Sequence, residues 1–131
     1  MSKINTKVTD SVDFFKGNKP SDLTAKFGSP LYVYSEEILR QRCRDVKNLV
    51  KYPKFSVNYS AKANSNLAFL EIVHEEGLNV DAMSPGEIFV ELKAGFKPEQ
   101  IFYISNNVTA EEMKFAIDHD VLISVDSVSQ L

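Results

Sequence analysis

The nonapeptide NYSAKANSN, residues Asn58–Asn66, places a lysine at the end of a stretch that we expect to form a β-strand. No carboxylate lies within five residues of Lys62 on either side. An amine that is partly removed from water is a candidate nucleophile for Schiff-base formation, because burial disfavours the charged ammonium. The spacing is about equally compatible with a lysine that extends along the surface into solvent.

Further polar residues lie at or just beyond the expected strand ends: Asp81, Ser84, Glu87, Asn106, Asn107 and Asp126. Asp81 falls inside a strand, where a carboxylate is costly unless it has a partner. We expect the Lys62 amine, or a group bound to it, to be that partner. Ser84 and Glu87 fit a helix-capping box, SPGE, which explains both residues without a function and is the favoured interpretation.

The remaining reactive side chains have structural explanations. His74 and His119 fall in helical segments with no third ligand at metal spacing, so no metal site is predicted. Cys43 lies on the apolar stripe of a helix that begins after Ser35, and we expect it in the core.

Composition narrows the class of protein. The chain has 131 residues, a formal net charge of −3 and one cysteine. This charge argues against a nucleic-acid surface, and a single cysteine fits a reducing compartment. Apolar runs are shorter than the roughly 20 residues of a membrane-spanning helix, and the first residues lack the apolar region of a secretory signal. These features predict a cytoplasmic protein that binds neither nucleic acid nor membrane.

Strand and helix signals alternate from residue 29 onward. Short β-branched and aromatic runs, LYVY, FSVNYSAK, LNVDAM, IFYIS and VLISV, are separated by helical patterns. These helices are expected to start at Ser35, at Asn64 or Ser65, at Ser84 and at Thr109. The first should end at Tyr52-Pro53 and the second at Gly77. A last helix start, DSVSQ, follows the final strand.

The expected strand ends are evenly spaced, 22, 21 and 21 residues apart, at Lys62, Ser84, Ser105 and Asp126. Such a repeat predicts parallel strands with right-handed crossovers, in a doubly wound sheet or a (β/α)8 barrel. The polar face of the lysine strand favours the barrel, because central strands of an open sheet are apolar on both faces. A closed barrel needs eight units in about 250 residues. We therefore expect an α/β fold, a partial (β/α)8 barrel of about four units, from the front part of a longer protein.

Several segments in this order, SPLYVYSEEILRQRCR, NYSAKANSN, GLNVDAMSPGE and ISVDS, resemble the N-terminal part of the diaminopimelate decarboxylases. These are pyridoxal 5′-phosphate (PLP) enzymes on an alanine-racemase-type barrel, related to ornithine and arginine decarboxylases. The resemblance runs from about Phe27 to Leu131. It implies residues 37–131 as the first half of a PLP-binding barrel, and residues 1–36 as a preceding segment whose strand packs on a C-terminal β-domain.

The resemblance also implies site residues. The lysine of the family's YxxKAN motif forms the Schiff base with PLP and corresponds to Lys62. The DxxSxxE motif corresponds to Asp81, Ser84 and Glu87, which are then implied to lie at the cofactor. Many relatives continue the third strand as GNNK, where this chain has Ser105-Asn106-Asn107-Val108. We therefore do not expect this chain to carry the role of that lysine.

The activity implied is decarboxylation of meso-diaminopimelate to L-lysine by a homodimeric enzyme. Other groups that hold the cofactor in the family lie beyond the position of Leu131, so the 131 residues alone are expected to be inactive. Two alternatives stay open: another decarboxylase of the same family, acting on ornithine, arginine or carboxynorspermidine, and a non-catalytic decarboxylase-like binding or regulatory protein.

Overall fold

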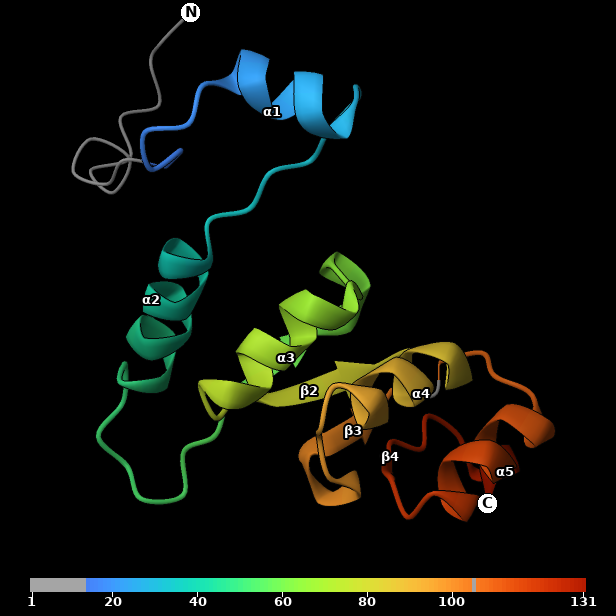
Figure 1. Cartoon of the computed structure of the whole chain (residues 1–131). Helices are drawn as coiled ribbons and strands as arrows, with labels where there is room; N and C mark the ends of the chain where they lie inside the picture. The colour runs from blue at the N-terminus through green and yellow to red at the C-terminus, as the bar shows by residue number, and fades with distance from the viewer. Residues whose placement is uncertain (1–13, 105) are drawn as a thin grey trace, which may run out of the picture.

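Four parallel strands of the described residues form one sheet, part of which is visible in Figure 1. The computed structural model describes residues 14–104 and 106–131. Its strands are β1 (Asn58–Ser60), β2 (Asn79–Ala82), β3 (Ile101–Tyr103) and β4 (Leu122–Ile123), in the order β1-β2-β3-β4. This order never reverses, whereas a doubly wound sheet reverses at its switch point. The predicted parallel α/β fold is confirmed, and the sheet of the described chain is open, with β1 and β4 at its edges.

Within residues 14–104 and 106–131, five α-helices and three short 3-10 helices accompany the sheet. The α-helices are α1 (Pro20–Phe27), α2 (Glu36–Lys47), α3 (Leu67–Glu75), α4 (Pro85–Lys93) and α5 (Ala110–Asp118). The 3-10 helices are η1 (Ala61–Ala63), η2 (Pro98–Gln100) and η3 (Val128–Gln130). Helix α1 buries none of its residues and lies apart from the sheet in Figure 1. No helix of the described residues is long and apolar enough to cross a membrane.

One face of the sheet packs against helices. Alternate residues of β2 and β3, such as Val80 and Tyr103, are fully buried. They join Leu70, Ile88 and Ala116 of the helices α3, α4 and α5 in the hydrophobic core. This alternation is what a strand with one covered face requires.

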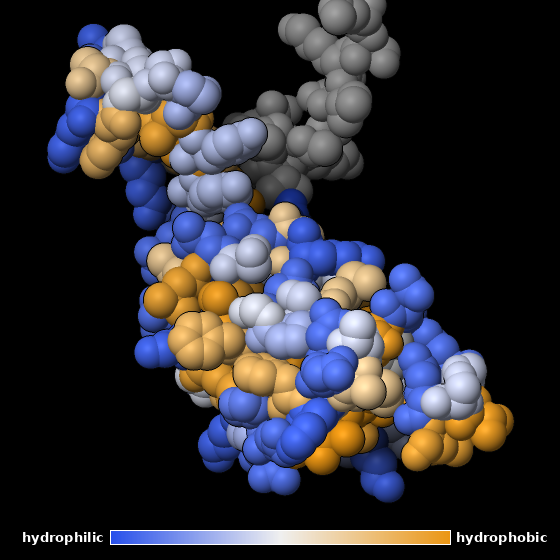
Figure 2. All heavy atoms as spheres, turned by 90° about the vertical axis from the view of Figure 1, so that its right-hand side faces the viewer, coloured by the Kyte–Doolittle hydropathy of each residue, from blue (hydrophilic) through white to orange (hydrophobic). Residues whose placement is uncertain are grey.

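The other face of the sheet is open in the described chain. The paired residues Ser60, Asp81, Phe102 and Leu122 follow one another across it. Leu122 is 64% exposed, and Val125 and Val128 beyond it are also exposed. Figure 2 shows apolar patches among polar residues on the side of the molecule that it views. In a barrel this open face would line the lumen. The sequence predicted a polar lumen face from the alternating polar residues of FSVNYSAK.

The same helix ending recurs in three successive units. Gly77, Gly95 and Asp120 follow α3, α4 and α5 with φ angles of +74°, +99° and +57°. In each unit this residue and the next donate to carbonyls of the last helical turn, as in Gly77 N to His74 O (2.8 Å) and Leu78 N to Val73 O (3.3 Å). These are Schellman motifs. The predicted stop at Gly77 is confirmed, and the motif turns each helix back toward its next strand.

Ion pairs link α2 to the C-terminal end of α3. Arg44 donates to both carboxylate oxygens of Glu76 at 2.7 and 2.8 Å, and Arg40 contacts Glu75 and Glu76. Lys47 Nζ donates to the Glu76 carbonyl at 3.0 Å. The hydrogen bond from Arg44 lowers the pKa of the Glu76 carboxyl. Cys43 of the same helix is buried in the core, as predicted.

Several predicted boundaries are wrong. Helix α2 ends at Lys47 rather than at Tyr52-Pro53, since Asn48 Nδ2 donates to the Arg44 carbonyl at 2.8 Å. Helix α3 begins at Leu67, later than a start at Asn64 or Ser65. Its cap is Asn66, whose side chain accepts from Ala68 N at 3.1 Å.

The segment Leu31–Tyr34, expected to be a strand, is irregular and pairs with none of the four strands. A strand needs a hydrogen-bonded neighbour. The sequence analysis expected this segment to pack on a C-terminal β-domain, and that packing stays a prediction.

Glu91 of α4 is an unusual core residue. Its side chain is fully buried, and neither carboxylate oxygen has a hydrogen-bond partner among the described residues. Burial first, and the nearby carboxylates of Glu87 and Asp81 second, raise the pKa of Glu91 to about 8. The folded protein therefore holds Glu91 protonated at neutral pH.

A buried protonated Glu91 should make stability fall as pH rises. Between about pH 4.5 and 8 the folded chain keeps a proton that the unfolded chain releases, so unfolding becomes easier by up to about 1.4 kcal/mol per pH unit. Glu91→Leu should flatten this slope in urea titrations at several pH values. The control Glu71→Leu, at an exposed position of α3, should leave the slope intact. An unchanged slope in Glu91→Leu would contradict the assignment.

Asp120 occupies the position that glycine holds in the two preceding units. Asp120→Gly should stabilise the fold by about 0.5–1 kcal/mol, because glycine adopts a positive φ without steric cost. Gly95→Ala should have the opposite effect, since its Cβ would lie 3.2 Å from the His74 ring. Thermal unfolding of both variants measures this, and equal shifts of the same sign would refute it.

Candidate functional site

Lys62 lies on η1, which follows β1 without a gap. The neighbouring Ala61 is fully buried and anchors the turn, and η1 packs against β2. The Lys62 side chain is exposed, so the expected partial burial is not found. Its amine makes no ion pair or hydrogen bond with any residue of the described ranges. The turn thus presents a free amine at the edge of the sheet where the carboxyl ends of the strands meet.

Asp81 has a partner that the sequence did not predict. Ser60 Oγ donates a hydrogen bond to Asp81 Oδ1 at 2.7 Å, across the pairing of β1 with β2. The expected ion pair between Asp81 and Lys62 is absent from the described part of the chain. The alternation of side chains along the predicted strand was enough to place Ser60 on the polar face. Its contact with Asp81 depends on the register of two strands that are 21 residues apart in sequence.

Ser84 and Glu87 form the predicted cap of α4. Ser84 Oγ accepts from the Glu87 backbone N–H at 3.2 Å. The Glu87 carboxylate reaches one residue further than a standard capping box and accepts from Met83 N at 2.6 Å. The two side chains therefore hold the loop between β2 and α4. Their contact with a cofactor stays a prediction.

Two loops at the same edge are joined by Asn106 and Asp126. With its amide nitrogen turned toward the carboxylate, Asn106 donates to Asp126 Oδ2 at 2.6 Å and Oδ1 at 3.3 Å. Asn107 has a φ of +55°, a conformation that asparagine tolerates. Val108 packs against the core. Ser105, the expected end of the third strand, lies outside the described residues.

The two histidines have structural contacts. The ring of His74 packs edge-on against Phe96, with centroids 5.0 Å apart. His119 lies 2.7 Å from the Phe115 carbonyl through Nδ1 and stacks on that residue's ring. Both contacts fit the structural interpretation of these residues.

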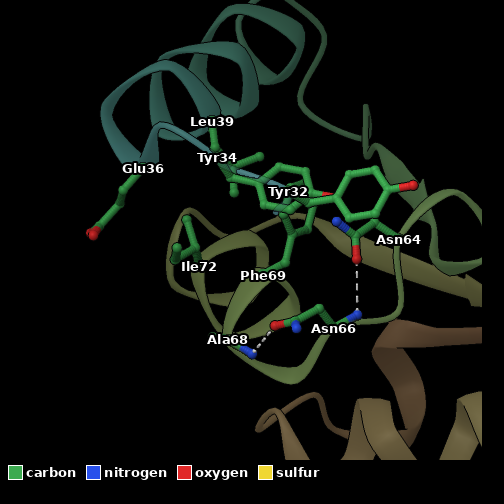
Figure 3. Close-up of a pocket in the computed structure, with 9 residues that line it drawn as sticks. All are labelled: Tyr32, Tyr34, Glu36, Leu39, Asn64, Asn66, Ala68, Phe69 and Ile72. Atoms are coloured by element: carbon green, nitrogen blue, oxygen red, sulfur yellow. Dashed lines mark hydrogen bonds between the residues drawn. The ribbon is translucent and has the colours of Figure 1, made fainter. Parts of the chain in front are cut away.

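A cavity of about 400 Å³ lies beside the lysine turn (Figure 3). It lies between the segment that leads into α2 and the start of α3. The residues that line it are Tyr32, Tyr34, Glu36, Leu39, Asn64, Asn66, Ala68, Phe69 and Ile72. Tyr34 and Phe69 meet edge to face at 5.8 Å. Neither Lys62 nor Asp81 lines this cavity, so it is separate from the edge that carries the candidate residues.

Replacing Ser84 by alanine should measure how much of its role is capping. Ser84→Ala should cost about 1 kcal/mol of stability, as N-cap losses do. Thr109→Ala is the matched control, because Thr109 caps α5 through the same contact at 3.3 Å and is not part of the DxxSxxE motif. We expect equal losses in chemical denaturation. A loss at Ser84 more than about twice that at Thr109 would show a further structural role.

Comparison with known proteins assigns the chain to a family. The profile described as "Pyridoxal-dependent decarboxylase, pyridoxal binding domain" matches residues 36–131. Diaminopimelate decarboxylase of Methanothermobacter thermautotrophicus is 46% identical over 112 residues, 84% of this chain and 26% of that protein. The Bacillus subtilis enzyme of the same name is 36% identical over 112 residues, 83% of this chain and 26% of that protein.

Solved structures agree with the sequence relatives. The diaminopimelate decarboxylase of Helicobacter pylori, complexed with L-lysine, matches with a TM-score of 0.77 and 31% identity, over 83% of this chain and 28% of that one. A lysine/ornithine decarboxylase of Vibrio vulnificus shares the fold, with a TM-score of 0.76 at 19% identity over 84% of this chain and 30% of that one. The chain spans about a quarter of the length of these relatives. It belongs to the family of pyridoxal-dependent decarboxylases, as part of their pyridoxal-binding domain.

Proposed function

We propose that this chain is the N-terminal part of the PLP-binding barrel of a diaminopimelate decarboxylase, which converts meso-diaminopimelate to L-lysine and CO2. Relatives of that name, 46% and 36% identical to this chain, support the proposal. The observation that carries it is the position of Lys62, an exposed amine on the turn directly after β1. In barrel enzymes, this end of the strands carries the active site.

Lys62 fits the reactive end of PLP. The cofactor carries an aldehyde, and an accessible amine condenses with an aldehyde to form a covalent bond with loss of water. Lys62 would hold the cofactor in this way and give it up to the amino group of the substrate. When bound, PLP supplies an electron sink for the electrons left behind as CO2 departs.

Asp81, Ser84 and Glu87 would surround the cofactor. The Asp81 carboxylate lies on the strand against which the lysine turn packs, and its negative charge favours a protonated nitrogen nearby. Ser84 and Glu87 keep the β2–α4 loop in place through the cap and the Met83 hydrogen bond. Their part is to fix the wall of the site beside Asp81.

The substrate and the assembly follow from the same assignment. The proposed substrate is a small amino acid, meso-diaminopimelate. The Helicobacter pylori relative is complexed with L-lysine, the product of the proposed reaction. Residues 37–131 would form the first half of the barrel, and residues 1–36 would precede it. The complete enzyme would be a homodimer in the cytoplasm.

Labelling with PLP tests the lysine assignment. The chain, joined to the remaining three quarters of the Methanothermobacter thermautotrophicus enzyme, is mixed with limiting PLP, reduced with borohydride and mapped by peptide mass spectrometry. Lys62 should carry most of the pyridoxyl label, and Lys62→Arg should abolish the label at that peptide. Lys97, exposed on another loop, serves as the internal control. Equal labelling of Lys62 and Lys97 would overturn the assignment.

A chimera tests the activity. The chain replaces the matching quarter of the Methanothermobacter thermautotrophicus enzyme, and CO2 release is measured from meso-diaminopimelate, ornithine and arginine. We expect turnover of meso-diaminopimelate, with Lys62→Ala lowering kcat by about a thousandfold or more. A chimera that folds and binds PLP but favours ornithine or arginine would contradict the proposed substrate. A folded chimera without any turnover would favour a binding or regulatory role.

A further inference from the structure

The hydrogen bond between Ser60 and Asp81 links the side chains of two paired residues of β1 and β2. It joins two side chains on the open face of the sheet, and although Ser60 is the residue before η1, its side chain makes no capping hydrogen bond there. Both are half-buried. A serine that only filled the open face would need no carboxylate partner, since its hydroxyl could bond to water.

The position of this pair relative to Lys62 is fixed by the backbone. Ser60 is the last residue of β1, and η1 begins at the next residue. The turn brings Lys62 to the side of β2, against which η1 packs, and β2 carries Asp81. The short segment from Ser60 to Lys62 therefore supplies both the amine and a hydrogen-bond donor for the neighbouring carboxylate.

Ser60 engages only one oxygen of that carboxylate. Oδ1 accepts the hydroxyl hydrogen at 2.7 Å, and Oδ2 receives no hydrogen bond from residues 14–104 or 106–131. A hydroxyl contact of this kind restricts rotation of the Asp81 side chain and leaves its second oxygen available to another donor. In an otherwise open site, this restriction maintains the direction of the negative charge.

We propose that Ser60 is a positioning residue that fixes the Asp81 carboxylate beside the lysine turn, so that its second oxygen serves the nitrogen of Lys62 when the cofactor is bound. This inference rests on the proposed function. Ser60 acts through Asp81 and contacts neither substrate nor cofactor itself. Its hydroxyl is the required feature, because a methyl group at the same place leaves Asp81 free to turn.

The test compares Ser60 substitutions of equal shape in this chain within the chimera described above, because the rest of the barrel would supply the other contacts to the cofactor. Ser60→Thr keeps the hydroxyl and Ser60→Val removes it, and both residues suit a strand. Ser56→Ala, on the same strand parity but exposed, is the control. The two readouts are the apparent Kd for PLP and the pH midpoint of the visible absorbance of the lysine-bound cofactor. Thermal unfolding is followed for each variant.

We expect Ser60→Val to weaken PLP binding about three- to tenfold, the range of one hydrogen bond. It should also shift the pH midpoint downward, because a protonated nitrogen loses an oriented negative charge. Ser60→Thr and Ser56→Ala should match the parent chimera. Asp81→Asn should reproduce the Ser60→Val effect, and the double variant should add little to it.

The outcomes separate this inference from the proposed function. If the parent chimera labels Lys62 selectively and Ser60→Val shifts neither readout, Ser60 has no positioning role while the lysine assignment stands. If Thr and Val variants change the readouts equally, the hydroxyl is irrelevant and the inference is wrong. If Lys62 of the parent chimera is not labelled selectively, the proposed function and this inference fail together.

Discussion

The parallel pairing of β1 with β2 is the constraint on which the arrangement of the site depends. It sets Tyr59 beside Val80 and Ser60 beside Asp81. Because side chains alternate across a strand, the same register sends Val80 to the helices and Asp81 to the open face. A shift by one residue would exchange the two faces, burying the carboxylate and exposing the apolar residue. Packing of the core therefore determines which polar groups meet at the edge.

Local motifs at the helix ends make this register reproducible from unit to unit. Side-chain caps at Asn66, Ser84 and Thr109 start α3, α4 and α5, and residues with positive φ end them. Each motif satisfies backbone groups that the helix leaves unpaired. The result is a strand-to-strand repeat of nearly constant length. Such a repeat delivers the end of every strand to the same edge, where a site can be assembled from several units.

The described chain combines a well-packed side with an open one. The helix side holds a continuous core and tolerates a buried carboxyl at Glu91 because that group stays protonated at neutral pH. On the open side, Leu122 is largely exposed and Asp81 meets only a hydroxyl. The relatives continue for about three quarters of their length outside the matched part. In a complete (β/α)8 barrel, the face that is open here would line the lumen.

The sequence by itself determined the strand–helix repeat, the caps at Ser84 and Thr109 and the stop at Gly77. These features depend on residues within a few positions of one another, so local patterns encode them. The sequence placed Lys62 at the end of a strand, whereas β1 ends at Ser60 and Lys62 lies on η1. The end of α2, the irregular path of Leu31–Tyr34 and the isolation of Glu91 were not predictable in this way. The Ser60–Asp81 bond and the Asn106–Asp126 contact join residues about 20 positions apart. Only the tertiary structure decided them, because side chains on different strands meet according to sheet register, which no local pattern specifies.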